Sequence, residues 1–284
     1  MVIESSFINV ENVERKPWEM FFIGFLYATA AVFLSIWIFK QYSSLIMVFL
    51  TVLASVPLMY NMLKHEEEFD ITAKGSEGSL LKHHIKALDF LLFMFLGFLV
   101  AYSIWFIALP SSLVQTLFSS QLDTISSINT QISGNAVSSN ITFQILFNNL
   151  KVLFFSIFFA FFYGAGAIFI LTWNASVISA AIGVLIKNNI ADYAASIGSV
   201  NAFNYFHIFS VSLLRFAIHG IPEIAAYFIG GIAGGIISVS IINHHLESMK
   251  FKKIIFDVLN LIILAVIILI IAALIEVFIT PTLF

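Results

Sequence analysis

The sequence predicts an all-α fold: a polytopic helical membrane protein with six clear transmembrane helices plus one or two short, broken or re-entrant helices around residues 175–219. Apolar residues make up 60% of the 284 residues and charged residues only 10%, whereas a soluble domain has about 25% charged residues. The long segments are apolar on every face, whereas the strands of a membrane β-barrel alternate in polarity at every second residue. These observations exclude a soluble domain and favour a helical bundle in the lipid bilayer.

Six segments are long enough to cross a bilayer, which takes about 20 mostly apolar residues. They are residues 20–39, 44–63, 88–109, 150–173, 222–242 and 254–278. Two shorter apolar pieces, residues 175–186 and 203–218, lie between the fourth and fifth segments. Each could be a short span, a re-entrant half-helix or an interfacial helix.

The spans divide the chain into five regions. We expect a polar cytoplasmic N-terminus, a three-helix transmembrane region, a polar extracytoplasmic segment, a core that holds the motif HGIPE, and a C-terminal transmembrane helix. Their bounds are 1–19, 20–109, 110–147, 148–243 and 244–284. Part of the extracytoplasmic segment is either an amphipathic helix on the membrane surface, because apolar residues recur there at helical spacing, or a flexible polar loop.

The positions of the basic residues predict the orientation of a multi-pass protein in the cell membrane. Nine of the thirteen flank the predicted spans on one side: Arg15, Lys16, Lys64, Lys74, Lys82, Lys86, Lys250, Lys252 and Lys253. Residues 110–147 contain no Lys or Arg. Because positive residues concentrate on the cytoplasmic side, we expect a cytoplasmic N-terminus and an extracytoplasmic C-terminus. Residues 174–243 then cross the membrane an even number of times, which we take to be twice.

Two of the spans carry a face of small residues spaced four apart. In residues 150–173 these are Ser156, Ala160 and Gly164, with Gly166 beside them. In residues 222–242 they are Ala226, Gly230, Gly234 and Ser238, with Gly231 and Gly235 alongside. Small residues let helix backbones approach closely in lipid, so we expect the two helices to pack on each other or each on a copy, as in a homodimer. A pore lining or a site for a partner helix is the alternative.

A charged cluster precedes the second of these faces. Arg215, His219 and Glu223 are spaced at four residues, which places them on one helix face. Proline removes a backbone hydrogen bond inside a helix but suits its first position. We therefore predict a break at Gly220 and Pro222, with one helix ending near His219 and the next beginning at the proline.

The cluster has several interpretations. Ionisable groups in a membrane cost about 2.5–3.5 kcal/mol each on insertion scales and are normally paired, so a buried pair of Glu223 with an arginine or histidine is the first. A proton or ion site and contact with a partner protein are the others. Asn148, Asn149 and Asn174, at the ends of the fourth span, could add oxygen ligands or cap helices. Zinc usually takes at least three protein ligands, and none beyond His219 and Glu223 is specified, so no metal site is expected.

Enzyme signatures are absent from the sequence. It contains no HExxH, GxSxG or GxxxxGK[ST] pattern and no cysteine, so it lacks the common metalloprotease, hydrolase and phosphate-binding motifs. We expect a protein that is not an enzyme, with no catalytic residue, no cofactor and no nucleic-acid partner.

Two segments resemble the stage II sporulation protein M family. They are FNNLKVLFFSIFFAFFYGAGAIFILTWNASVISAAIG, residues 147–183, and AIHGIPEIAAYFIGGIAGG, residues 217–235. The resemblance covers about residues 147–243, in the family's order, and departs from it at Ala175, where the family usually has glycine. The shared positions are Asn148, Asn149, Gly164, Asn174, His219, Gly220, Glu223, Gly230, Gly231 and Gly234.

The resemblance implies a polytopic membrane protein without known enzymatic activity, whose namesake acts as a scaffold for cell-wall hydrolases. We therefore predict a membrane scaffold or assembly protein that positions a membrane or extracytoplasmic protein partner. The alternative is a secondary transporter or channel with an ion or proton site at Glu223. A transporter needs a water-accessible cavity that reaches Glu223, whereas a scaffold would bury this residue dry against Arg215 or His219.

Overall fold

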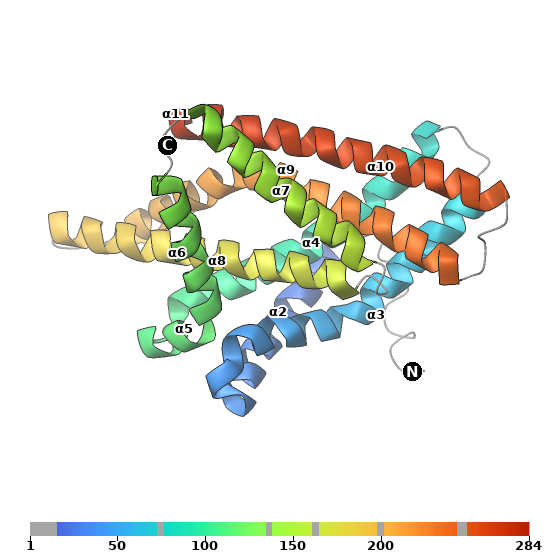
Figure 1. Cartoon of the computed structure of the whole chain (residues 1–284). Helices are drawn as coiled ribbons and strands as arrows, with labels where there is room; N and C mark the ends of the chain where they lie inside the picture. The colour runs from blue at the N-terminus through green and yellow to red at the C-terminus, as the bar shows by residue number, and fades with distance from the viewer. Residues whose placement is uncertain are drawn as a thin grey trace.

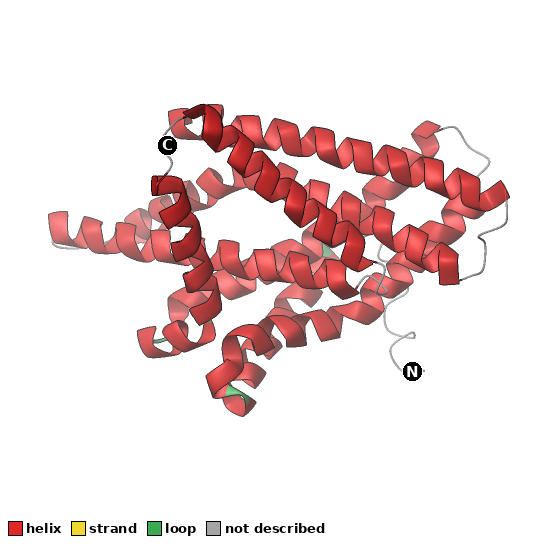
Figure 2. Ribbon diagram, viewed as in Figure 1, coloured by secondary structure: helices red, strands yellow, loops and turns green. Residues whose placement is uncertain are grey.

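The computed structural model describes residues 16–72, 77–134, 138–160, 165–197, 202–242 and 249–283, and these form helices joined by short connections (Figures 1 and 2). The long helices are α2 (Glu19–Ile38), α3 (Ser43–Thr72), α4 (Glu77–Ala108), α6 (Ser119–Gly134), α7 (Ser138–Ala160), α8 (Ala165–Ile197), α9 (Ala202–Ile242) and α10 (Met249–Leu274). The short ones are η2 (Lys40–Tyr42), α5 (Ser111–Leu117), the π-helical turn η3 (Ile275–Ile279) and α11 (Thr280–Leu283). The predicted all-α fold is confirmed.

Seven helices in the described part of the chain are long and apolar enough to cross a membrane. The stretches are Glu19–Ile38, Lys40–Glu66, Ile85–Ala108, Ile141–Ala160, Ile168–Asn188, Ala217–Ile241 and Phe251–Leu283. The first three and the last two agree closely with predicted spans. The shorter apolar pieces are parts of longer helices: residues 175–186 lie within α8, and residues 203–218 form the first part of α9.

The fourth predicted span, residues 150–173, is wrong as a single helix. Helix α7 ends at Ala160 and α8 begins at Ala165, while Gly164 lies outside the described residues. As a consequence, the apolar stretch of α7 begins at Ile141, and Asn149 lies within a span and not at its end.

Helix α9 forms the centre of the bundle. Of its apolar stretch 83% is buried, against 22% for α7 and 28% for α2. It packs against α3, α4, α7, α8 and α10. Phe228 of α9 is fully buried and meets the ring of Phe95 of α4 edge-on, with ring centroids 5.7 Å apart. The exposed apolar side chains lie mainly on the surrounding helices, as expected for a bundle that faces lipid.

The segment between α4 and α7 is folded onto the bundle as α5 and α6, so of the two alternatives its described residues adopt the helical one. The Ser44 hydroxyl of α3 donates to the side-chain oxygen of Gln121 at 2.8 Å, and the Gln121 amide donates to the Ser176 hydroxyl of α8 at 3.0 Å. Gln121 is fully buried. Phe118 packs on Phe106, with ring centroids 5.0 Å apart. These contacts fix α5 and α6 against α3, α4 and α8.

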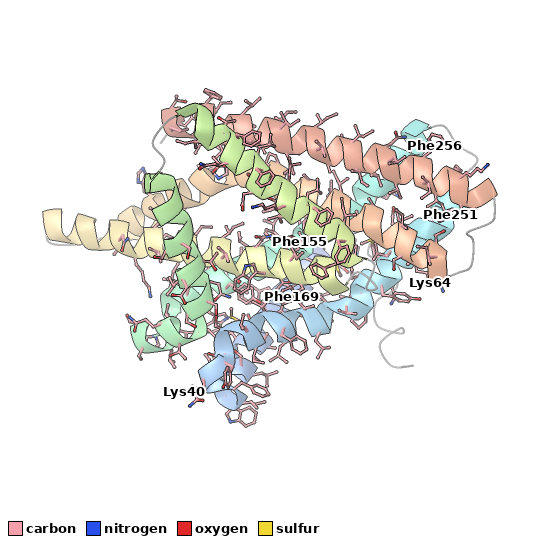
Figure 3. All side chains as sticks on the ribbon, in the orientation of Figure 1. Lys40, Lys64, Phe155, Phe169, Phe251 and Phe256 are labelled. Carbon is pink, nitrogen blue, oxygen red and sulfur yellow. The ribbon has the colours of Figure 1, made fainter. Side chains whose placement is uncertain are left out.

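Lysine positions show how the helices are directed. Lys40, in the turn between α2 and α3, lies at the opposite end of the bundle from Lys64 and Phe251, which mark the end of α3 and the start of α10 (Figure 3). The predicted orientation requires Lys40 on one side of the membrane and the other two on the opposite side, and this arrangement is compatible with it.

Candidate functional site

The structure corrects the predicted helix break. Helix α9 is continuous from Ala202 to Ile242 and passes through Gly220 and Pro222, so the predicted break is wrong. A proline inside a helix removes one backbone hydrogen bond, whereas a break exposes up to four N–H and four C=O groups at two helix ends. In an apolar environment each unsatisfied backbone group is expensive, so the continuous helix is the less costly solution.

Glu223 of α9 has two side-chain partners from other helices. The Asn149 amide of α7 donates to Glu223 Oε1 at 2.5 Å. The second partner is the carboxyl group of Glu276 in the π-helical turn, which is hydrogen-bonded to that of Glu223. These bonds join α7, α9 and the end of α10, which are far apart in the sequence. We call Asn149, Glu223, Tyr227 and Glu276 the carboxyl cluster.

The turn that carries Glu276 has an unusual geometry. The backbone N–H of Thr280 donates to the carbonyl of Ile275, five residues earlier, as in a π-helix. The turn ends two residues before Pro281, whose ring would clash with a carbonyl in a regular α-helix. Thr280 is buried, and its hydroxyl lies 3.3 Å from His219 Nδ1. Single π turns inside helices are frequent at functional sites.

The hydrogen bond between the carboxyl groups of Glu223 and Glu276 limits the number of protons that the pair carries. An ionised carboxylate only accepts hydrogen bonds, so a bond between Glu223 and Glu276 requires one proton on the pair. Tyr227, one turn after Glu223, is 5% exposed and interacts electrostatically with both carboxyl groups. No basic side chain takes part in the hydrogen bonds that the structure describes for Glu223; the side chain of Arg215 lies outside the described residues. A hydrogen bond within the pair would therefore use one shared proton, and the Asn149 amide is the second donor to Glu223.

The members of the cluster lie at one depth in the bundle. Asn149, Glu223 and Glu276 are eight, six and seven residues from Ile141, Ala217 and Leu283, the ends of their apolar stretches. At a rise of 1.5 Å per residue this is about 9–12 Å inside those ends. The turn η3 and helix α11 pack against α9, and α7 packs against both α9 and α10.

The other predicted polar residues lie outside the cluster. Asn148 is exposed on α7, and Asn174 is half-buried on α8. Within the described side chains, no group of three or more His, Cys, Asp or Glu residues could hold a metal ion.

The small-residue face of α9 packs on two neighbours. A Cβ atom added to Gly234 would lie 2.5 Å from the carbonyl oxygen of Ile157 and 2.8 Å from Ala160 Cβ, both on α7. At Gly230 it would meet Leu153 and Ile157 of the same helix. Gly235 faces Leu63 of α3. The remaining predicted members Ser156, Ala226, Gly231 and Ser238 are buried, while the surroundings of Gly166 are not described. The small-residue face of α9 therefore packs on α7 within one chain, where Ala160 is the member of the other predicted face that Gly234 approaches.

The sequence interpretation missed Glu276 and Tyr227. Glu276 lies in the most apolar stretch of the chain, and an ionisable residue there is itself a signal, because its cost in a membrane requires a partner. Tyr227 stands four residues after Glu223, on the same helix face. What the sequence could not indicate is that Glu276 faces Glu223 across the bundle.

Residues 87–281 match the family described as Stage II sporulation protein M. The chain belongs to this family. The stage II sporulation protein M match extends from α4 to α11 and includes every residue of the carboxyl cluster, whereas the resemblance read from the sequence ends at residue 243. The family is not a known enzyme family. No curated protein and no solved structure matches the chain.

Proposed function

We propose that this multi-pass membrane protein is a scaffold that assembles or positions a partner complex in the membrane. The observation that carries the proposal is that α7 and α9 are joined at two levels, at one of which the C-terminal helix takes part. The carboxyl cluster links them near one side of the bundle, and Gly234 holds the α7 and α9 backbones together further along. Helices joined in this way keep their outer surfaces in fixed relative positions, which a scaffold requires to position a partner.

The docked segment α5–α6 supports the same proposal. Gln121 fastens it to α3 and α8 through buried hydrogen bonds. In the proposed orientation, with the C-terminus outside the cytoplasm, this segment presents an ordered polar surface to an extracytoplasmic partner.

The test compares two substitutions at each acid of the pair. A glutamine can donate and accept as a protonated carboxyl group does, so Glu223→Gln and Glu276→Gln should keep fold and assembly. Glu223→Ala leaves the Asn149 amide and Glu276 without a partner and should cost about 1–3 kcal/mol of stability. Thermal unfolding in mild detergent and co-purification of bound proteins measure both effects. Glu19→Ala is the control, at a partly exposed residue whose carboxylate oxygen lies 3.5 Å from Lys16 Nζ.

The second candidate function is a secondary transporter or channel. The observation that favours it is the pairing of two acids, because a carboxyl pair can take up and release a proton or a cation. A transporter predicts that Glu223→Gln folds normally and loses flux in proteoliposomes. The scaffold predicts no ion or proton flux above that of empty liposomes in the wild type, so flux that disappears in this folded variant would refute it.

A further inference from the structure

Helix α7 presents a stripe of exposed side chains on the face opposite the carboxyl cluster. Its members are Phe143, Phe147, Lys151, Phe154 and Phe158, spaced at three or four residues, which places them on one side of a helix. The four rings are 50–67% exposed. Phe155, labelled in Figure 3, lies beside the stripe on the same helix. An aromatic stripe by itself suits lipid, but a lysine in its centre does not.

Lys151 lies near the middle of the membrane-spanning stretch. It is ten residues from Ile141 and nine from Ala160, about 14–15 Å from either end at 1.5 Å per residue. Lysines near helix ends reach the interface with their long side chains, but a lysine at the centre of a span must find a partner or a cavity. Among the described residues its contact is the ring of Phe147, 4.6 Å from Nζ.

We propose that this stripe is the docking face for a transmembrane helix of a partner protein that carries an aspartate or glutamate at the depth of Lys151. The proposal rests on the scaffold function and names its partner class. A carboxylate would neutralise the ammonium group in lipid, and the rings around it would exclude water and lipid from the pair, as at a hot spot of an interface. The charge therefore selects the partner, and the rings supply the contact area.

A second copy of this chain does not fit the stripe. Copies of a membrane protein insert in the same orientation, so a twofold interface through α7 would place the two Lys151 residues at the same depth. Such an interface brings the same patch of each subunit together, and like charges close to each other disfavour association. The homodimer predicted as one option from the sequence is therefore not expected through this face.

The experiment uses the full-length protein in nanodiscs of neutral phosphatidylcholine. The probe is a fluorescent model transmembrane peptide of leucine and alanine with one central glutamate, compared with the same peptide carrying glutamine. We expect the glutamate peptide to bind about tenfold more tightly. Lys151→Met should abolish this preference, and Lys151→Glu should reverse it toward a peptide with a central lysine. Lys187→Met is the matched control, because Lys187 lies over the ring of Phe106 at 5.0 Å on another helix, and it should leave the preference unchanged.

Three outcomes would overturn the docking face. The two peptides could bind equally to the wild type, or the preference could survive in Lys151→Met with normal thermal stability. In nanodiscs with anionic phosphatidylglycerol, loss of the preference would show that a lipid phosphate covers Lys151 in place of a protein. The two proposals fail in distinguishable ways. Ion flux together with a glutamate preference would refute the scaffold function and leave the docking face as a binding site, whereas absence of both flux and preference would refute the docking face alone.

Discussion

At the scale of single residues, Gly234 decides how closely α7 and α9 approach. Its added Cβ would meet the carbonyl oxygen of Ile157, and a backbone atom cannot move aside as a flexible side chain can. Gly230 differs, because the nearest atom there is the end of the Leu153 side chain. Gly220 is the opposite case, since nothing lies within 4 Å of a Cβ at that position.

We predict that Gly234→Leu destabilises the protein by about 1–3 kcal/mol or more, because overpacking displaces the facing backbone. Gly220→Ala is the matched control on the same helix and should be neutral or stabilising by about 0.5–1 kcal/mol, because alanine favours a helix over glycine. Thermal unfolding midpoints in mild detergent measure both. Equal midpoints for Gly234→Leu and the wild type would refute the close contact between α7 and α9.

The carboxyl cluster shows which site residues could be predicted from the sequence and which of their partners could not. The cost of burying a charge singles out Glu223, and the same reasoning applied to every span would have found Glu276. The identity of their partners could not be predicted, because spacing along one helix suggested Arg215 and His219, whereas the described bonds come from α7 and the C-terminal turn. Contacts between helices depend on how the whole bundle packs.

At the scale of helices, long apolar runs were sufficient to predict α2, α3, α4 and α10. Prediction failed where the chain uses glycine and proline. Residues 150–173 form parts of two helices, although their composition predicts one span. Pro222 lies inside a helix at a point where a helix end was predicted. In water a helix end is satisfied by solvent, but in an apolar bundle the backbone is better satisfied within a continuous helix.

A substitution at Pro222 tests the continuity of α9. Pro222→Ala restores the N–H group that can bond to the carbonyl of Ile218, four residues earlier, so the variant should be more stable, by up to about 3 kcal/mol. The measurement is again the unfolding midpoint in detergent. A clear loss of stability would show that the proline is required at this position, as the start of a separate helix would demand.

At the scale of the whole molecule, seven described helices are long and apolar enough to cross a membrane, and if each crosses once, Glu19 and Thr282 lie on opposite sides. The absence of cysteine allows single cysteines to be placed without background. In right-side-out vesicles we predict that a membrane-impermeant maleimide labels Thr282→Cys directly and Lys252→Cys only after permeabilisation. Labelling of both positions from the same side would contradict the proposed topology.

The most direct test of the account is the protonation of Glu223 and Glu276, because a hydrogen bond between the two carboxyl groups needs one shared proton. Infrared spectra of the protein in liposomes at pH 7 distinguish protonated from ionised carboxyl groups. We predict one protonated carboxyl signal that disappears in Glu223→Gln and also in Glu276→Gln, because an amide opposite the remaining acid supplies the hydrogen in place of the proton. A spectrum in which neither substitution removes a protonated carboxyl group would contradict the account.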